Sequence, residues 1–197
     1  MAAASEVAPL RVVIAEDEAI IRLDLKEILE EEGYEVVGET GLGDEAVRLV
    51  RDLQPDLAIL DIKMPGMDGL TAAREITQDR LAAVLILTAF SQRELIEQAR
   101  DAGALAYLVK PFQKSDLVPA IEMALGRHRE LLALSREVKG LEQQLETRKI
   151  VDRAKGILMD GHGMNEAQSF SWIQRRAMDE RTTMRAVAER VIAGELP

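Results

Sequence analysis

The sequence of 197 residues contains no cysteine, and aromatic residues make up only 3% of it. Without cysteine, a disulfide framework, a thiolate zinc site and a cysteine nucleophile are excluded. The longest apolar runs, such as Ala82 to Leu87, are far too short to span a bilayer, and residues 1–9 lack the basic start of a signal peptide. We therefore expect a cytoplasmic protein with no membrane partner, which begins with a flexible segment over residues 1–9.

Acidic residues outnumber basic ones overall, but not in every part of the chain. The formal net charge is −10 at pH 7, which disfavours non-specific attraction of the whole chain to nucleic acid or anionic membranes. Residues 1–135 contain 14 basic and 25 acidic groups, whereas residues 136–197 contain 11 basic and 10 acidic groups. The last third of the chain can therefore present a local basic face.

Short β-rich apolar runs alternate with longer stretches of helical period between Leu10 and Phe112. This alternation is typical of repeated βαβ units around a parallel sheet. The predicted strands are Arg11–Ala15, Glu35–Glu39, Leu57–Asp61, Val84–Thr88 and Ala106–Val109, and the predicted helices are Ala19–Glu32, Asp44–Gln54, Leu70–Asp79 and Arg93–Ala102. Gly33 and Gly103 stand where left-handed residues end helices. The sequence thus predicts an α/β domain with a doubly wound, five-stranded parallel sheet.

A long helical pattern follows the sheet domain. It begins at Ser115 or Asp116, tolerates Pro119 in its first turn, and stops at Gly161-His162-Gly163. Five apolar residues within it have the three- and four-residue spacing of a coiled-coil seam, namely Leu131, Leu134, Val138, Leu141 and Leu145. Packing of this helix on its own domain is the alternative.

Two shorter helices are predicted after the glycines. Asn165 with Gln168 has the pattern of an N-cap and its partner three residues on, for a helix that continues through Met178. Thr182 or Thr183 opens a last helix through Ile192. The long helix therefore leads into a small all-α domain of three helices.

Polar side chains end several of the predicted strands. In open parallel sheets, functional groups collect at this edge. Here they are Glu16 and Asp17 after the first strand, Asp61 on the third, Thr88 on the fourth and Lys110 on the fifth. Three converging carboxylates require a cation, and an all-oxygen set suits Mg²⁺. A Mg²⁺ ion and a lysine would neutralise an incoming phosphoryl group as Asp61 attacks it to form an acyl phosphate.

An enzyme must be weighed against a regulatory protein. Phosphatases of the haloacid dehalogenase class also phosphorylate an aspartate at a strand end, but they need a second acid two residues later. Position 63 is lysine. The residues therefore favour a phosphoacceptor that stores a signal over an enzyme.

The motifs Glu16-Asp17, Asp61-Ile-Lys-Met-Pro-Gly-Met-Asp-Gly69, Thr88-Ala89, Tyr107 and Lys110-Pro111-Phe112 resemble the receiver domain of two-component response regulators. The resemblance covers residues 10–126 and implies a flavodoxin-like fold and a histidine kinase as partner. It implies that Asp61 is the phosphoacceptor, and that Mg²⁺ is held by the acidic pair, Asp61 and the carbonyl of Lys63. It also implies phosphoryl contacts from Thr88 and Lys110, a switch role for Tyr107, and a cis peptide before Pro111.

Basic residues recur along the helical tail, at Arg148, Lys149, Arg153, Lys155, Arg175 and Arg176. They could follow a phosphate backbone, or they could form a solvated face with salt bridges to Asp152, Asp179 and Glu189. Phe170 and Trp172 are expected in the core of the tail, and a platform for an RNA base is the alternative for these aromatics. The remaining expected core residues are Ile157, Leu158, Ile173, Met178, Val187 and Val191.

The runs from Arg148 to Met159, Asn165-Glu-Ala, Phe170-Ser-Trp-Ile, Arg175-Arg-Ala-Met178 and Val187-Ala188 resemble the ANTAR domain, an RNA-binding output module. The resemblance implies a domain over residues 141–197 after a helical linker over residues 127–140. It implies binding of hairpin RNA in nascent transcripts and transcription antitermination, with the six basic residues as RNA contacts. Position 174 is glutamine where the family often has arginine.

Other outputs for the tail remain open. It could bind another protein when the first domain is phosphorylated, whereas a DNA-binding role has less support because no clear helix-turn-helix is present. We also predict a phosphorylation-dependent homodimer through the leucine seam, and its alternative is a monomer in which the same leucines pack on the first domain.

Overall fold

The computed structural model describes residues 8–89 and 93–195, which form two compact units that meet between Leu132 and Ala133. This boundary lies within the predicted linker, residues 127–140. No helix of these described residues is long and apolar enough to cross a membrane. Each unit has an apolar core of its own.

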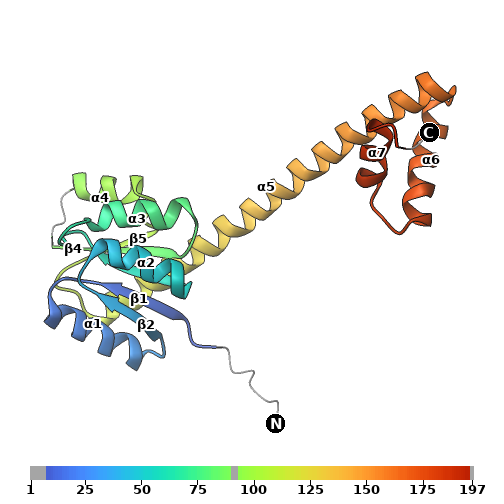
Figure 1. Cartoon of the computed structure of the whole chain (residues 1–197). Coiled ribbons are helices and arrows are strands. Elements are labelled where there is room, and N and C mark those ends of the chain that lie inside the picture. The colour runs from blue at the N-terminus through green and yellow to red at the C-terminus, as the bar shows by residue number, and fades with distance from the viewer. Residues whose placement is uncertain (1–7, 90–92, 196–197) are drawn as a thin grey trace, which may run out of the picture. The chain divides into compact units, whose positions relative to one another are not determined.

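The first unit contains one sheet of five parallel strands in the order β2-β1-β3-β4-β5 (Figure 1). The strands are β1 (Arg11–Ala15), β2 (Glu35–Thr40), β3 (Leu57–Asp61), β4 (Ala83–Thr88) and β5 (Ala106–Val109). The strand order reverses between β1 and β3, where ligand sites of open sheets are found. The predicted doubly wound fold is confirmed, and the strand bounds differ from the predicted ones by one residue at most.

Helices cover both faces of this sheet (Figure 1). They are α1 (Ala19–Glu31), α2 (Gly43–Leu53), α3 (Gly69–Gln78), α4 (Arg93–Asp101) and the first turns of α5 (Lys114–His162). Successive strand residues alternate between two cores, because side chains of a strand point to opposite faces. Val13 and Ala58 pack with α2, α3 and α4, whereas Ile14 and Ile59 pack with α1 and α5. Gly33 and Gly103 have positive φ as expected.

The start of α5 differs from the prediction. Asp116 and Leu117 donate backbone hydrogen bonds to the carbonyl of Gln113, and the Asp116 carboxylate accepts from the Gln113 N–H. The helix therefore begins at Lys114, and Pro119 lies in its second turn rather than its first. The peptide bond between Lys110 and Pro111 is cis, as the receiver resemblance implies.

The second unit consists of the later turns of α5, α6 (Glu166–Asp179) and α7 (Met184–Ile192). Asn165 and Gln168 form the predicted capping box, and the Thr183 hydroxyl accepts a hydrogen bond at the start of α7. Leu158, Ile173, Val187 and Val191 form a core as expected, together with Val151, Ala154, Ala177 and Ala188.

Three residues expected in this core lie at the surface instead. Met178 is 73% exposed, Phe170 is 43% exposed and Ile157 is 38% exposed. On α6 the buried positions are Ser169, Ile173 and Ala177, so residues one position later point away from the core. Trp172 is partly buried against the core. The core prediction was therefore wrong for Phe170, Met178 and Ile157.

A glycine at the start of α3 lies close to the end of β3. A Cβ atom on Gly69 would lie 1.9 Å from the carbonyl oxygen of Asp61. We expect Gly69→Ala to lower the free energy of unfolding by roughly 1–3 kcal/mol, because the loop must move to relieve this overlap. Thermal and urea unfolding measure the effect. The matched control is Gly126→Ala in α5, where no atom lies within 4 Å, and which should stabilise the protein by about 0.5–1 kcal/mol. Equal effects of the two substitutions would contradict the prediction.

Candidate functional site

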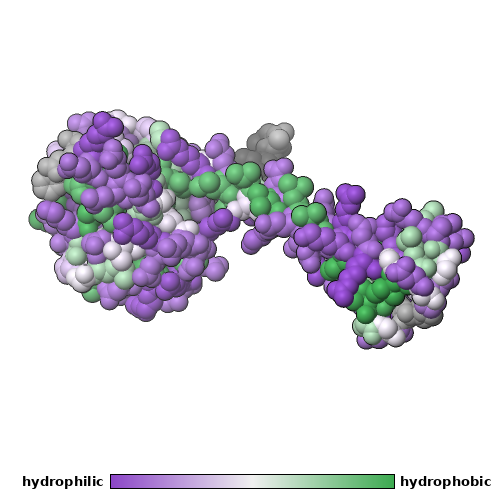
Figure 2. Space-filling view, turned by 90° about the horizontal axis from the view of Figure 1, so that it is seen from above, coloured by the Kyte–Doolittle hydropathy of each residue, from purple (hydrophilic) through white to green (hydrophobic). Residues whose placement is uncertain are grey.

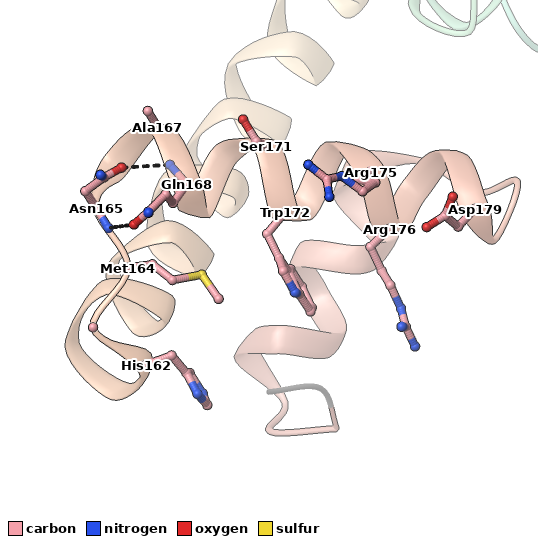
Figure 3. A pocket seen from close by; sticks show the side chains of 11 residues that line it. His162, Met164, Asn165, Ala167, Gln168, Ser171, Trp172, Arg175, Arg176 and Asp179 are labelled. Carbon is pink, nitrogen blue, oxygen red and sulfur yellow. Dashed lines mark hydrogen bonds between the residues drawn. The ribbon is translucent and has the colours of Figure 1, made fainter.

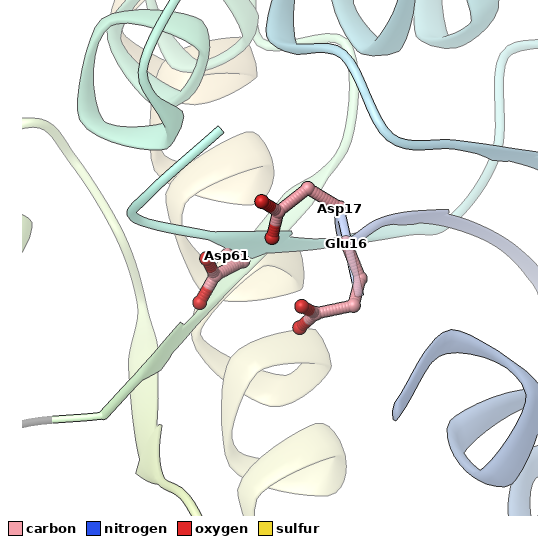
Figure 4. A group of neighbouring side chains, drawn as sticks. All are labelled: Glu16, Asp17 and Asp61. Atoms are coloured by element: carbon pink, nitrogen blue, oxygen red, sulfur yellow. The ribbon is translucent and has the colours of Figure 1, made fainter. Parts of the chain in front are cut away.

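Three carboxylates meet where β1 and β3 end (Figure 4). Glu16, Asp17 and Asp61 each offer an oxygen within 4.8 Å of the others. Glu16 is fully buried, Asp61 is 5% exposed, and Asp17 is exposed. The parallel register explains the meeting, because Ala15 of β1 pairs with Leu60, the residue before Asp61. The cluster can thus hold a cation on its solvent side.

Lys110 supplies the positive charge of this cluster. Its Nζ atom lies 2.8 Å from Oδ1 of Asp61 and 2.5 Å from Oε2 of Glu16. The lysine side chain is only 11% exposed. Lys110 therefore pairs with two of the three carboxylates, Glu16 and Asp61. One lysine balances only one of the three negative charges, and the all-oxygen donor set of Glu16, Asp17 and Asp61 fits a hard cation.

Burial and charge oppose each other in the ionisation of this site. Burial raises the pKa of Glu16, and the charge of Asp61 adds to this effect while Lys110 opposes it. Burial alone would lower the pKa of Lys110, but its hydrogen bonds to Asp61 and Glu16 outweigh burial and raise that pKa. Lys110 therefore remains a fixed ammonium group, and the cluster favours a further cation because one lysine faces three carboxylates.

Hydrogen bonds that involve backbone groups hold Asp61 and Glu16 in place. The N–H of Lys63 donates to Oδ2 of Asp61 at 3.0 Å, and the other carboxylate oxygen, Oδ1, faces Lys110. The guanidinium of Arg22, on α1, donates to the carbonyl oxygen of Glu16. The sequence analysis missed Arg22. An arginine five residues after the acidic pair, near the start of the predicted helix, was the available signal.

The remaining predicted receiver residues are divided between two places. Thr88 is 3% exposed at the end of β4, where its backbone pairs with Val109, the residue before Lys110. Tyr107 is 45% exposed and lines a groove of about 650 Å³ with Ile96 of α4 and Met123 of α5. The structure therefore places Thr88 at the carboxylate edge and Tyr107 on the groove side of β5.

The six predicted RNA contacts differ in how far their charge is already neutralised. Lys155 is 14% exposed and forms ion pairs with Asp152 at 2.8 Å and with Glu166 at 2.9 Å, which connects α5 to the first turn of α6. Arg176 pairs with Glu180, and Arg148 lies 3.9 Å from Asp152. The others, Lys149, Arg153 and Arg175, are exposed and have no ion pair within the described part of the chain.

Two grooves lie on the second unit. One, of about 920 Å³, is lined by His162, Met164, Trp172, Arg175 and Arg176 among others (Figure 3). Asn165 and Gln168 also line it, but both side chains are used in the capping box. The other, of about 640 Å³, lies between α5, Phe170 and Met184.

Comparisons with known proteins agree with both units. Residues 12–122 match the response regulator receiver domain, and residues 139–192 match the ANTAR domain. The chain is 62% identical over 184 residues to the transcriptional regulatory protein PdtaR of Mycobacterium tuberculosis, covering 93% of this chain and 90% of that protein. The chain belongs to the response regulators that join a receiver domain to an ANTAR domain.

Two more relatives resemble the receiver unit alone. The chemotaxis protein CheY of Thermotoga maritima is 42% identical over 112 residues, covering 56% of this chain and 93% of that protein. In the CheX–CheY–BeF₃–Mg²⁺ complex of Borrelia burgdorferi, the similar chain has a TM-score of 0.55 and 28% identity, covering 57% of this chain and 87% of that chain. Receiver domains bind Mg²⁺ through an acidic pocket, and Glu16, Asp17 and Asp61 form such a pocket here.

Proposed function

We propose that a histidine kinase phosphorylates this response regulator on Asp61, and that phosphorylation controls hairpin RNA binding and transcription antitermination by the ANTAR unit in the cytoplasm. One observation carries the proposal. A buried aspartate beside a fixed ammonium group and two further carboxylates lies in the same chain as an ANTAR domain. The protein is then a regulatory phosphoacceptor rather than an enzyme.

Each of the receiver residues has a separate role in the proposed phosphoryl transfer. An Asp61 oxygen attacks the phosphorus atom, the bond from phosphorus to the kinase histidine breaks, and an acyl phosphate forms. Lys110 is already positioned to pair with a phosphoryl oxygen, because its Nζ lies against Oδ1 of Asp61. Glu16, Asp17, Asp61 and the carbonyl of Lys63 would hold Mg²⁺, which would supply positive charge to offset that of the phosphoryl group. Thr88 donates a hydrogen bond to a phosphoryl oxygen. Tyr107 changes its position after phosphorylation and thereby alters the groove that it lines.

We propose that phosphorylation of the receiver unit acts on the ANTAR unit by causing dimerisation through α5. The seam residues Leu131, Leu134, Val138, Leu141 and Leu145 are 46–59% exposed. Figure 2 shows hydrophobic residues gathered along this part of α5. A second copy of the chain would cover these side chains and would place two ANTAR units on one RNA with paired hairpins.

Binding measurements with three nucleic acids test the proposed output. We expect the phosphorylated protein to bind hairpin RNA more tightly than duplex DNA of the same sequence or RNA without hairpins. The unphosphorylated protein should bind hairpin RNA more weakly. Equal binding to all three, with or without phosphorylation, would contradict the proposal. In that case phosphorylation-dependent binding of a protein by the tail becomes the better account.

We expect the three basic side chains without an ion pair among the described residues to make most of the contacts with RNA phosphates. Single alanine substitutions of Lys149, Arg153 or Arg175 should weaken hairpin RNA binding and lower the salt dependence by about one counterion each. Lys155→Ala should instead lower the melting temperature, because it leaves Asp152 and Glu166 without their shared partner.

Filter-binding titrations at several salt concentrations, with melting curves, separate these outcomes. Arg74→Ala is the charge-matched control, because Arg74 is an exposed arginine of the receiver unit. If removal of Lys149, Arg153 and Arg175 leaves both affinity and salt dependence at the level of this control, these residues are not RNA contacts.

A further inference from the structure

A groove of the ANTAR unit is lined by an exposed aromatic ring and by several polar side chains, some of which have no hydrogen-bond partner within the described part of the chain. It has a volume of about 640 Å³, and its lining includes Gln143, Gln144, Thr147 and Arg148 of α5 and Phe170 of α6. We propose that this groove binds one unpaired nucleobase of the RNA, stacked on the ring of Phe170. The inference rests on the RNA binding proposed above and identifies where a base, rather than a phosphate, is bound.

The ring of Phe170 is the first reason. The whole chain contains only six aromatic residues, and this phenylalanine is 43% exposed although neighbouring Ser169 and Ile173 of α6 are fully buried. Leaving such a ring in water costs free energy, which stacking on a flat partner would recover. Nucleobases removed from their stack pair with aromatic side chains in this way.

Unused hydrogen-bonding groups are the second reason. The side chains of Gln143, Gln144 and Thr147 have no hydrogen-bond partner among the described residues. An amide carries both a donor and an acceptor, which is the combination that the edge of a base presents. These groups could form hydrogen bonds with the edge of a base, whereas an apolar side chain of a partner protein would leave them without hydrogen bonds.

The local charge also suits RNA. Arg148 and Lys155 line the groove, and the negative charge of Asp152 is taken up by Lys155 at 2.8 Å. Arg148 is 83% exposed and lies 3.9 Å from Asp152, so it can turn towards a phosphate next to the bound base. The groove therefore does not repel an anionic strand.

The other groove of this unit fits a base less well. Figure 3 shows that the side-chain oxygens of Asn165 and Gln168 accept backbone hydrogen bonds at the start of α6, so these acceptors are already used. Trp172 also lines that groove, but its ring is partly buried against the apolar core. The groove beside Phe170 is therefore favoured.

Coupling between a side-chain change and a base deletion tests the proposal. Hairpin RNAs with one abasic nucleotide at each loop position are titrated against wild type, Phe170→Leu and Phe170→Tyr. Loss of stacking should make Phe170→Leu bind intact RNA roughly fivefold to hundredfold more weakly, and Phe170→Tyr should bind nearly as wild type. At one loop position, the abasic nucleotide should weaken RNA binding by wild type but should not weaken RNA binding by Phe170→Leu any further.

The outcomes separate this inference from the proposed function. The salt dependence of Phe170→Leu should equal that of wild type, because no phosphate contact is removed. If the effects of Phe170→Leu and of every abasic position are additive, or if Phe170→Leu binds as wild type, the base site is wrong while RNA binding stands. If wild type binds no hairpin RNA, the proposed function fails, and the base site fails with it. Circular dichroism shows whether each variant is folded.

Discussion

Asp61→Asn is expected to reduce phosphoryl uptake from a kinase or a small phosphodonor to background. The amide lacks the nucleophilic oxygen that attacks phosphorus, although it has almost the same shape as the carboxylate. The amide keeps one oxygen, which can accept from the backbone N–H of Lys63 or from the ammonium of Lys110 but not from both where they now lie, and the apolar cores are unchanged, so the fold should be retained. Removal of divalent cations with a chelator should block uptake by the unaltered protein as well, because three carboxylates then face the phosphoryl group with one lysine.

Intact-protein mass spectrometry measures this result directly. Wild type should gain one phosphoryl group, and peptide mapping should place it on residue 61. Asp52→Asn is the matched control, because Asp52 is an exposed aspartate of α2 and the substitution is equally conservative. Labelling of Asp61→Asn at the wild-type rate would show that another residue accepts the phosphoryl group.

The fold of the receiver unit could be predicted because its signals are local. β3 and β4 are buried along their whole length and read as continuous apolar runs, whereas α2 carries apolar residues on one face. Helix ends could also be predicted where a glycine or a capping side chain is present, as at Gly33 and Asn165. The start of α5 was misplaced by one or two residues, because it depends on hydrogen bonds to Gln113 rather than on periodicity.

The carboxylate edge could be predicted for a topological reason. Parallel strands end at the same edge, so Asp17 and Asp61, which are 44 positions apart in the sequence, could be predicted as neighbours without any knowledge of side-chain contacts. The contact of Arg22 with the Glu16 carbonyl could not be derived in this way, since it depends on how α1 leaves the strand. The sequence could also not show that Glu16 is fully buried while Asp17 is exposed.

The ANTAR unit was harder to predict because three short helices offer several apolar faces. Phe170 and Met178 have the composition of core residues, yet Ile173 and Ala177 occupy the packed face of α6. Charge patterns were equally ambiguous. Lys155 pairs with Glu166 across the turn between two helices, and this contact depends on tertiary structure.

The seam on α5 leads to the second large expected effect. Phosphorylated wild type should form a dimer in solution, and Leu134→Glu/Leu141→Glu should remain monomeric with hairpin RNA affinity lower by roughly 10²- to 10⁴-fold. Both leucines are more than half exposed, so the substitutions remove little packing within one chain, but they would place four like charges in a paired seam. Multi-angle light scattering with and without a phosphodonor measures the mass.

A weak seam suits a switch better than a permanent dimer. Gly140 lies inside the seam segment of α5 with no atom within 4 Å of a Cβ position, so it costs helix stability without a packing reason. Ala133→Glu, an exposed position off the seam, is the control for added charge and should dimerise as wild type. If phosphorylated wild type gains RNA affinity while its mass stays that of a monomer, dimerisation is not the mechanism. Release of the seam leucines from the receiver would then explain how Asp61 controls the ANTAR unit, since the same five side chains would be freed rather than paired.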